Sequence, residues 1–512
     1  MIEKTYDIAV IGGGGSGLTA AVRAASLSGK KVVILEKSGH TGGGMIMAST
    51  MRTFRSKWQK ERNLPDVTET YLRKVMDDTY WRLDSHLVGN AILATGQFFD
   101  WFCELAGGDI GEKFRIGRYV FDDESGPLGP QMGGPGGVTG SGRLFMDTLR
   151  EKCDTFGVDV LLKHRVTDCE IKDGKITAVL AEGPDGPVRV NCTSTIISIG
   201  SWINNDAMLA ELFPQFLTAK QHMDPSPHMS PNYTGDGFVL AEKANALMDK
   251  DNYTLRLMGP MVFSKSGTIA NMSNSPFSLA INTAGRRYIC EPSQIRNGVF
   301  DSGLMMMEQP EGYVYIVFDT NNLEAAIRDQ REHPVPPAPG VFGLPDMPAD
   351  ADAARADVEN VLGKEKNVYM AESIEELAAQ LNINTEAFLH TISDYNRFAE
   401  EGFDRDCFKD AAFLIPCTKA PFYAVQAKLG TDGVFGGIQV NGDMQAYRAD
   451  GTLIDGLYVT GDFASGRFIN MAGVKVQVLN DMSWALASGF IAGTNVCAAD
   501  TGRGNLVSNQ LK

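Results

Sequence analysis

Residues 7–17 read Asp-Ile-Ala-Val-Ile-Gly-Gly-Gly-Gly-Ser-Gly. After Asp7, residues 8–11 form a continuous apolar run rich in β-branched side chains, which is typical of a parallel strand buried on both faces. The glycines that follow have the spacing G-x-G-x-x-G. Residues 18–28 then carry apolar side chains at helical spacing, and Gly29 stands where a helix C-cap belongs. The stretch therefore predicts a strand, a tight turn and a helix.

The glycines of this turn have separate physical tasks. Gly12 permits the tight turn, Gly14 lets a phosphate approach the backbone, and Gly17 lets the helix pack closely on the strand. A pyrophosphate would then lie at the amino terminus of the helix, where backbone N–H groups point outward. The predicted phosphate-contacting residues are Gly12, Gly14, Gly15, Ser16 and Gly17.

A second apolar strand, residues 31–35, ends at Glu36. This acid lies about 20 residues after the glycine turn, where a carboxylate accepts hydrogen bonds from an adenosine ribose. Its negative charge argues against a ribose 2′-phosphate. Strand, turn, helix, strand and acid in this order predict a dinucleotide-binding domain.

Two further segments indicate which dinucleotide is bound. Residues 37–44 read Lys-Ser-Gly-His-Thr-Gly-Gly-Gly, a second glycine-rich stretch that a nicotinamide domain does not need. A flavin domain uses such a stretch to carry backbone along the ribityl chain and the isoalloxazine. Near the other end, residues 456–462 read Gly-Leu-Tyr-Val-Thr-Gly-Asp, a strand that delivers an acid able to bind a ribityl hydroxyl. Together they favour FAD over NAD.

Composition limits the remaining possibilities. A chain of 512 residues exceeds what one hydrophobic core usually organises, and 43% hydrophobic with 21% charged residues is an ordinary globular composition. The formal net charge of -16 comes without any Lys/Arg-rich run, so we expect neither nucleic acid nor an anionic membrane as a partner. The eight cysteines form no C-x-x-C pair or Cys/His cluster, so we expect no metal site and no disulfide.

The chain enters its first strand with no signal-peptide pattern ahead of it. No uninterrupted apolar stretch reaches the roughly 18 residues that a membrane-spanning helix needs. The expected location is the cytoplasm.

Several segments, taken in order, resemble the fumarate reductase and succinate dehydrogenase flavoprotein superfamily, which includes 3-ketosteroid dehydrogenases and ene-reductases of anaerobic bacteria. These segments are T-I-I-S-I-G-S at 195–201, T-G-D-G at 234–237, N-T-A-G-R-R-Y-I-C-E at 282–291, and Gly436-Gly437 ahead of the closing flavin strand. Ser201 replaces the second glycine of the family's pattern.

The resemblance implies an α/β fold with a discontinuous Rossmann-like FAD-binding domain, residues 1–248 and 416–512. An α+β capping domain, residues 249–415, would be inserted between the two parts, and residues 373–401 are expected to be helical within it. It also implies non-covalent FAD, bound by the glycine turn and by Glu36, Lys37, Gly42, Gly43, Gly44, Val166, Gly200, Asp236, Gly461, Asp462, Gly473 and Val474.

His40 raises the alternative of a covalent flavin, because succinate dehydrogenases tether FAD through a histidine in a similar His-Thr sequence. Their histidine lies about eight residues beyond the strand, a position that Gly44 holds here, so the spacing favours non-covalent binding.

Enzymes of this superfamily move a hydride between flavin N5 and a carbon β to an electron-withdrawing group, while a protein residue handles the proton. By resemblance, Arg296 is the candidate proton donor; it stands one residue beyond the gapless equivalent, so a structural ion pair is the alternative. Arg467 and Lys475 are candidates for clamping a carboxylate or stabilising reduced flavin, with plain surface cations as the alternative.

The substrate half departs from the dicarboxylate-specific members. They carry histidines just before the Gly-Gly pair, whereas residues 431–435 here read Thr-Asp-Gly-Val-Phe. We therefore expect reduction of an activated C=C bond in an enone, an aryl acrylate or a steroid- or polyphenol-like substrate rather than in fumarate. The reverse dehydrogenation, reductive dehydroxylation of a polyphenol, and a role as a flavoprotein electron-transfer subunit stay open. Electrons would come from a diffusible donor such as NAD(P)H, reduced flavin or a small redox protein.

Overall fold

The computed structural model describes the greater part of the chain. The described residues are 1–48, 50–108, 110–116, 131–133, 141–212, 214, 217, 220, 223–225, 231–249, 254–262, 264–291, 303, 305–332, 347–466, 468–471 and 474–498. They form two compact units. The first comprises described residues within Met1–Leu212, Pro227–Leu255 and Gly433–Lys512, and the second those within Phe213–Ser226 and Arg256–Asp432.

A six-stranded sheet forms the centre of the first unit, in the order β18-β19-β11-β2-β3-β7. Neighbours from β19 to β7 are parallel, and β18 is antiparallel to β19. Strand β2 is buried along its whole length, as its apolar run predicts. The strands are β2 (Ile8–Ile11), β3 (Val32–Glu36), β7 (Asp159–Leu162), β11 (Ser194–Ile197), β18 (Gln445–Tyr447) and β19 (Leu453–Val459).

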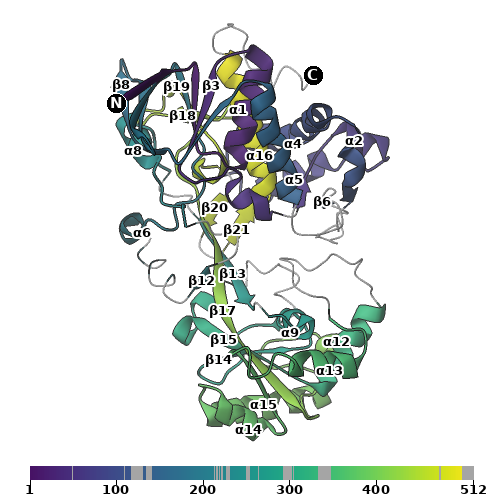
Figure 1. Cartoon of the computed structure of the whole chain (residues 1–512). Helices are drawn as coiled ribbons and strands as arrows, with labels where there is room; N and C mark the ends of the chain where they lie inside the picture. Colours follow the sequence, from purple (N-terminus) through teal and green to yellow (C-terminus); the bar gives the residue numbers. More distant parts are fainter. Residues whose placement is uncertain are drawn as a thin grey trace. The chain divides into compact units, whose positions relative to one another are not determined.

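Helix α1, Gly15–Ser28, follows β2 directly and ends at Gly29, which has the left-handed conformation of a C-cap (φ 65°). It packs along α16, Asp481–Ala498, as Figure 1 shows. The two backbones come close because α16 presents glycine to α1: a Cβ on Gly489 would lie 2.3 Å from the Ser16 carbonyl oxygen. The last helix of the described residues is therefore packed on the first.

The first unit contains further sheets and helices. A four-stranded sheet has the order β1-β10-β9-β8, a three-stranded sheet the order β4-β6-β5, and β20 pairs with β21. The strands are β1 (Ile2–Thr5), β4 (Thr50–Arg52), β5 (Arg115–Ile116), β6 (Gln131–Gly133), β8 (Arg165–Lys172), β9 (Lys175–Gly183), β10 (Gly186–Asn191), β20 (Phe468–Met471) and β21 (Val474–Gln477). The helices are α2 (Lys57–Glu61), α3 (Thr68–Asp78), α4 (Ser85–Ala106), α5 (Ser141–Thr155), α6 (Asp206–Leu212) and α8 (Phe238–Lys243).

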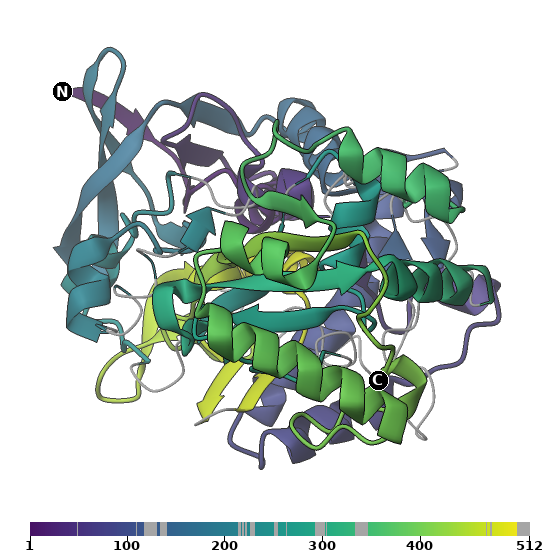
Figure 2. The ribbon, with the colours of Figure 1, turned by 90° about the horizontal axis from the view of Figure 1, so that it is seen from below.

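The second unit is built on a sheet of order β12-β17-β15-β14, with β13 and β16 also paired to β17. Figure 2 shows these strands in teal and green with helices beside them. The strands are β12 (Met223–Pro225), β13 (Thr254–Met261), β14 (Leu279–Asn282), β15 (Tyr313–Asp319), β16 (Val368–Ala371) and β17 (Phe422–Phe435). The helices are α9 (Gly267–Met272), α12 (Thr320–Glu332), α13 (Ala351–Glu359), α14 (Ile374–Gln380) and α15 (Thr385–Glu401).

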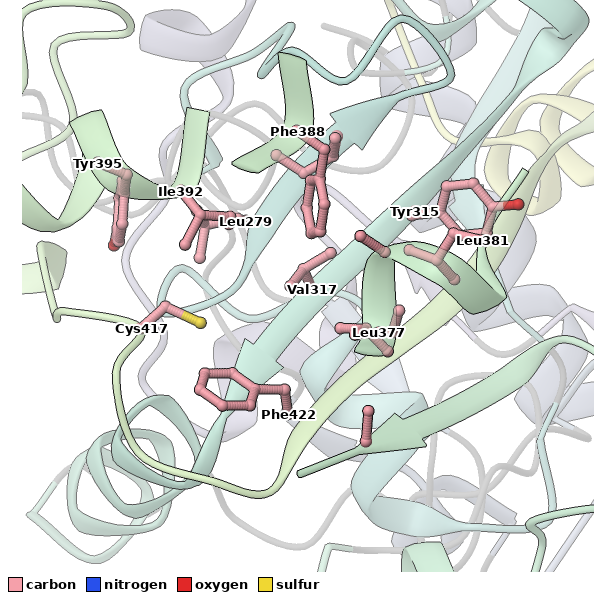
Figure 3. Packing of buried hydrophobic residues seen from close by; sticks show 14 of the residues in the cluster. Leu279, Tyr315, Val317, Leu377, Leu381, Phe388, Ile392, Tyr395, Cys417 and Phe422 are labelled. Carbon is pink, nitrogen blue, oxygen red and sulfur yellow. The ribbon is translucent and has the colours of Figure 1, made fainter. Parts of the chain in front are cut away.

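Apolar side chains from α14 and α15 pack on one face of this sheet. Figure 3 shows Leu377 of α14 and Phe388 of α15 directed toward Val317 of β15, and all three are fully buried. Burying a Leu or Phe side chain contributes about 2–3 kcal/mol, so this cluster stabilises the packing of α14 and α15 on the sheet.

The expectation of one helical stretch over residues 373–401 is correct in type but wrong in continuity. The chain forms two helices, and residues 381–384 separate them. Asn384 caps α15 by accepting a hydrogen bond from the Ala387 N–H, and its own N–H donates to the Thr283 carbonyl oxygen at 2.9 Å. This contact with a residue distant in sequence breaks a run that side-chain periodicity alone would continue.

A buried ion cluster lies beneath the same helix and includes Arg287 and Glu291 of segment 282–291. Arg287 donates to both oxygens of Glu291, and its other terminal nitrogen lies 2.8 Å from Asp404 Oδ2. Lys409 Nζ lies 3.4 Å from Glu291 Oε2. Two cations and two carboxylates thus neutralise one another, with every side chain at most 2% exposed.

Candidate functional site

The first glycine turn has the geometry that a bound pyrophosphate requires. Gly12 has φ +103°, and a Cβ on Gly17 would lie 2.0 Å from the Gly12 carbonyl oxygen, so neither position accepts a side chain. Gly14 is the N-cap of α1 and, being glycine, has no side chain that could cap the helix. No atom of the described chain lies within 4 Å of a Cβ placed on Gly14. The start of α1 is thus an open backbone cradle for phosphate oxygens.

Glu36 is tied to this turn from the end of β3. Its Oε2 accepts a hydrogen bond from the Gly13 N–H at 2.7 Å, and its Oε1 accepts one from the Ser38 N–H at 2.7 Å. A carboxylate has about four lone-pair positions, so acceptor capacity remains for two ribose hydroxyls. The acid predicted to bind ribose therefore stands beside the predicted phosphate site.

The second glycine stretch also lies against the first. The Gly42 N–H donates to the Gly13 carbonyl oxygen at 2.8 Å, and Gly42 pairs with Gly14 in an isolated parallel bridge. Gly42 has φ +108°, and a Cβ on Gly43 would lie 3.5 Å from Gly14 Cα. A short 3-10 helix, Gly43–Met47, begins here and includes Gly44. Two glycine-rich segments thus form one backbone surface.

The turn that carries Asp462, near the end of the chain, lies at the same amino terminus of α1 as the two glycine segments. It follows β19 as a 3-10 turn, Gly461–Phe463. Gly461 has φ +67°, and a Cβ there would lie 2.7 Å from the Ser16 hydroxyl oxygen. Its N–H donates to Ser488 Oγ at 3.0 Å, and Trp484 Nε1 donates to its carbonyl oxygen at 2.8 Å. Helix α16 therefore holds Asp462 beside the amino terminus of α1.

These features meet because parallel strands end at one edge of the sheet. Ile11, Ile197 and Val459 are in register across β2, β11 and β19. The residues just beyond two of these ends are linked, since Ser198 Oγ lies 2.6 Å from Thr460 Oγ1. In open α/β sheets ligands bind outside this carboxyl edge.

Asp236 belongs to a polar network at the ends of β3 and β8. Lys37 Nζ donates to Asp236 Oδ2 at 2.9 Å and to Thr234 Oγ1 at 2.6 Å, and Arg165 donates to both Asp236 oxygens. Burial of the carboxyl opposes its ionisation, but the hydrogen bonds from Arg165 and Lys37 hold the pKa of Asp236 below its usual range. Its side chain thus joins three segments, and a direct contact with cofactor stays a prediction.

Other predicted residues are placed less directly. Val166 is buried in β8 opposite Ala181, and Gly200 has φ +70° with a Cβ position 3.2 Å from the Tyr233 ring. Val474 and Lys475 lie in β21, where Lys475 pairs with Asn470. The predicted residues outside the described part of the chain are Arg296, Arg467 and Gly473. The Lys475 side chain is likewise not described.

Three contacts near these turns have no local signature in the sequence. The Ser201 hydroxyl, fully buried, accepts hydrogen bonds from the Val434 N–H at 2.9 Å and the Ile203 N–H at 3.3 Å. Ser465 donates to the carboxylate of Asp249, and Ser198 meets Thr460. Only the position of Ser201 beside the family's glycine pair could have indicated that it matters.

Comparison with known proteins agrees with this geometry. The family model described as an FAD binding domain matches residues 7–472, which span the cradle, Glu36 and the Asp462 turn. The chain belongs to this FAD-binding domain family. Its cofactor is FAD and it is a flavoprotein oxidoreductase, which confirms the family and cofactor predicted from the sequence.

Curated relatives share sequence along most of the chain. The vinyl phenol reductase of Lactiplantibacillus plantarum is 24% identical over 91% of this chain and 91% of its own length. The NADH:fumarate oxidoreductase of Klebsiella pneumoniae is 25% identical over 90% of this chain, which spans only 45% of that protein.

A solved flavocytochrome c3 fumarate reductase in its open conformation has the same fold, with a TM-score of 0.69 at 20% identity, covering 97% of this chain and 78% of that one. The likeness confirms the predicted class, an α/β FAD-binding fold with a further domain. Within the described residues, no helix is long and apolar enough to cross a membrane. None of those residues gather in a group of three or more His, Cys, Asp or Glu suited to hold a metal.

Proposed function

We propose that this flavoprotein reduces an activated C=C bond of an organic substrate bulkier than a dicarboxylate, such as an enone, an aryl acrylate or a steroid- or polyphenol-like compound. The observation that carries the cofactor half of the proposal is the convergence of Gly14, Gly42 and Gly461 at the amino terminus of α1. The substrate half is supported by the match with a vinyl phenol reductase over nine-tenths of both chains.

Different residues of the first unit would bind different parts of the FAD molecule. Backbone N–H groups of Gly14 to Gly17 would hold the pyrophosphate, Glu36 the adenosine ribose and Asp462 a ribityl hydroxyl. When bound, FAD supplies the hydride that is transferred to the substrate carbon. Binding is proposed to be non-covalent, because Gly44 carries no side chain at the position that the tethering histidine holds in succinate dehydrogenases. The first unit would be the FAD-binding domain and the second the capping domain.

Three candidate residues come from the sequence alone. Arg296 and Arg467 lie outside the described residues, and Lys475 lies in β21 but its side chain is not described. Arg296 would supply the proton to the carbon adjacent to the hydride acceptor. Arg467 and Lys475 would orient or stabilise negative charge on the activating group and the reduced flavin. We propose that a diffusible donor, NAD(P)H, free reduced flavin or a small redox protein, delivers the electrons.

The proposal is tested with the FAD-loaded protein under anaerobic conditions. The flavin is reduced with light, and a vinyl phenol, an aryl acrylate, an enone and fumarate are added separately while the visible flavin band is followed. We expect rapid reoxidation by at least one of the first three and slow reoxidation by fumarate. Fastest reoxidation by fumarate would contradict the substrate class, and a purified protein with no extractable flavin would contradict the cofactor.

Mass analysis of the product separates reduction from dehydroxylation. Reduction of a C=C bond adds two hydrogens and leaves every oxygen in place. A product that has lost an oxygen atom would show the alternative chemistry. The variant R296K, which keeps the charge but alters proton donation, should slow reoxidation by the accepted substrate and leave photoreduction unchanged. Equal rates in R296K and the parent protein would remove Arg296 as proton donor.

A further inference from the structure

Three chain segments are joined by backbone hydrogen bonds next to the Asp462 turn. The Asp249 N–H donates to the Gly437 carbonyl oxygen at 2.9 Å, and Met248 and Ile438 form an antiparallel bridge. Ile438 in turn bridges Ala464 in parallel fashion. Residues 247–249, 436–439 and 461–465 therefore behave as a small three-stranded assembly within the first unit.

A buried side-chain contact closes this assembly. Ser465, 1% exposed, donates its hydroxyl proton to Oδ2 of Asp249, which is 7% exposed. Removing a carboxylate from water is costly unless it is hydrogen-bonded, so the contact with Ser465 is part of what retains the acid there. The sequence contains no local motif that pairs an acid at 249 with a serine at 465.

The contact lies at the end of the turn that carries Asp462. Helix α16 anchors the beginning of that turn through the bonds of Ser488 and Trp484 to Gly461. The middle is held because the Gly436 N–H donates to the Asp462 carbonyl oxygen at 2.8 Å. Ser465 lies two residues beyond the Gly461–Phe463 turn, at the end of the segment Gly461–Ser465, and its own N–H donates to the Ile438 carbonyl oxygen at 2.9 Å.

We propose that Asp249 is a positioning residue for the flavin: through Ser465 it holds the segment Gly461–Ser465, which contains the Asp462 turn, in the geometry that the ribityl chain requires. The inference rests on the proposed role of Asp462 as ribityl ligand. Asp249 acts through another residue and takes no part in proton or hydride transfer. Loss of the contact would let the residues after Asp462 shift, and the affinity for FAD would fall.

The test compares apoprotein and FAD-loaded protein of four variants, S465A, S465T, D249N and the double variant D249N/S465A. The dissociation constant of FAD is measured by quenching of flavin fluorescence. S465A should raise it about tenfold, since hydrogen bonds to charged groups are worth roughly that factor. S465T, which retains the hydroxyl, should restore most of the affinity. The double variant should bind FAD no more weakly than S465A alone, because S465A already removes the contact that D249N weakens by taking away the charge of its acceptor.

A matched serine–carboxylate contact in the second unit is the control. Ser266 is also fully buried and donates to Asp357 Oδ2 at 2.7 Å. S266A should lower the thermal midpoint at least as much as S465A does, because Ser266 also caps α9 by accepting a hydrogen bond from the Ile269 N–H, yet it should leave the FAD dissociation constant unchanged. S465A should also shift the visible flavin spectrum and the flavin midpoint potential, which a purely structural serine would not do.

Two outcomes overturn the inference. One is wild-type FAD affinity and spectrum in both S465A and D249N. The other is an equal loss of FAD affinity in S266A, which would make the effect one of general stability. D462N separates this inference from the proposal beneath it: if D462N binds FAD as the parent protein does, the ribityl role itself fails. If D462N is weakened while S465A and D249N are not, the positioning role alone fails.

Discussion

Arg287 and Glu291 form a buried two-bond ion pair in the second unit, with N–O distances of 3.0 Å and 2.8 Å and both side chains 2% exposed. The four-residue spacing of the two along the chain lies inside the segment 282–291 that resembles the superfamily. Lys409 and Asp404 complete the charge balance around the pair. Arg287 and Glu291 of this segment are therefore structural in this unit.

E291Q should destabilise the protein by about 3 kcal/mol or more, because it leaves the Arg287 and Lys409 charges buried with one carboxylate fewer. Urea unfolding followed by tryptophan fluorescence measures the change. D154N is the control, since it breaks the exposed Arg150–Asp154 pair, and it should leave the unfolding midpoint unchanged. Equal midpoints for E291Q and the parent protein would show that the cluster contributes no stability.

The difference in stability between the parent protein and E291Q should depend on pH. Burial opposes ionisation of Glu291, but Lys409 and Arg287 hold its pKa below the usual range. A carboxyl with a lowered folded-state pKa contributes stability that is present above its unfolded pKa and is lost as pH falls through the folded value. The difference between the two unfolding midpoints should therefore be largest near neutral pH and shrink below about pH 4. A difference that grows on acidification would contradict this.

G14A and G17A should separate cofactor binding from folding. A Cβ on Gly14 fills open space, so G14A should fold normally but bind FAD at least about tenfold more weakly, because the methyl group occupies the phosphate cradle. A Cβ on Gly17 meets the Gly12 carbonyl oxygen at 2.0 Å, so G17A should lose both stability and FAD. Thermal unfolding of the apoprotein and FAD titration measure the two effects.

The control for these variants is G89A in α4, where an added Cβ meets no atom of the described chain within 4 Å. It should leave FAD affinity unchanged and stabilise the helix by about 0.5–1 kcal/mol. Normal FAD affinity in G14A would show that the cradle does not receive the phosphates.

D236N should weaken FAD binding if the network of Asp236, Lys37 and Arg165 shapes the adenosine end of the site. The change removes the negative charge that holds both cations, so the ends of β3 and β8 lose a cross-link. D455N, which breaks the exposed Lys175–Asp455 pair, is the matched control and should bind FAD normally. The affinity for FAD is measured by titration of both apoproteins. Equal affinities of D236N and D455N would show that Asp236 has no role in the cofactor site.

Local order was predictable from the sequence wherever adjacent residues carry the signal. The buried run before Gly12 became β2, the helical periodicity after Gly17 became α1, and Gly29 took the left-handed conformation expected of a C-cap. The strand predicted in residues 456–462 became the second half of β19, which begins at Leu453, and led to the Asp462 turn. In each case backbone sterics and side-chain spacing within a few residues determine the outcome.

Side-chain periodicity did not predict where a helix ends when a residue distant in sequence hydrogen-bonds to its backbone. Residues 373–401 have helical spacing throughout, yet the bond from Asn384 to Thr283 and the cap on Ala387 divide them into two helices. Propensity favours a continuous helix only weakly, and one tertiary hydrogen bond with a cap is enough to end it.

Neighbouring residues specify the strand, glycine turn and helix that suit a dinucleotide, and the second glycine stretch together with Asp462 indicates FAD. The folded chain was needed to show that Ser16 meets Gly461, that Asp249 accepts a hydrogen bond from Ser465 and that Arg287 is neutralised by Glu291 and Asp404. The physical reason is that glycine turns and buried strands are specified by neighbouring residues. A buried polar pair instead requires two positions far apart in sequence to meet away from water, and neither position reveals its partner.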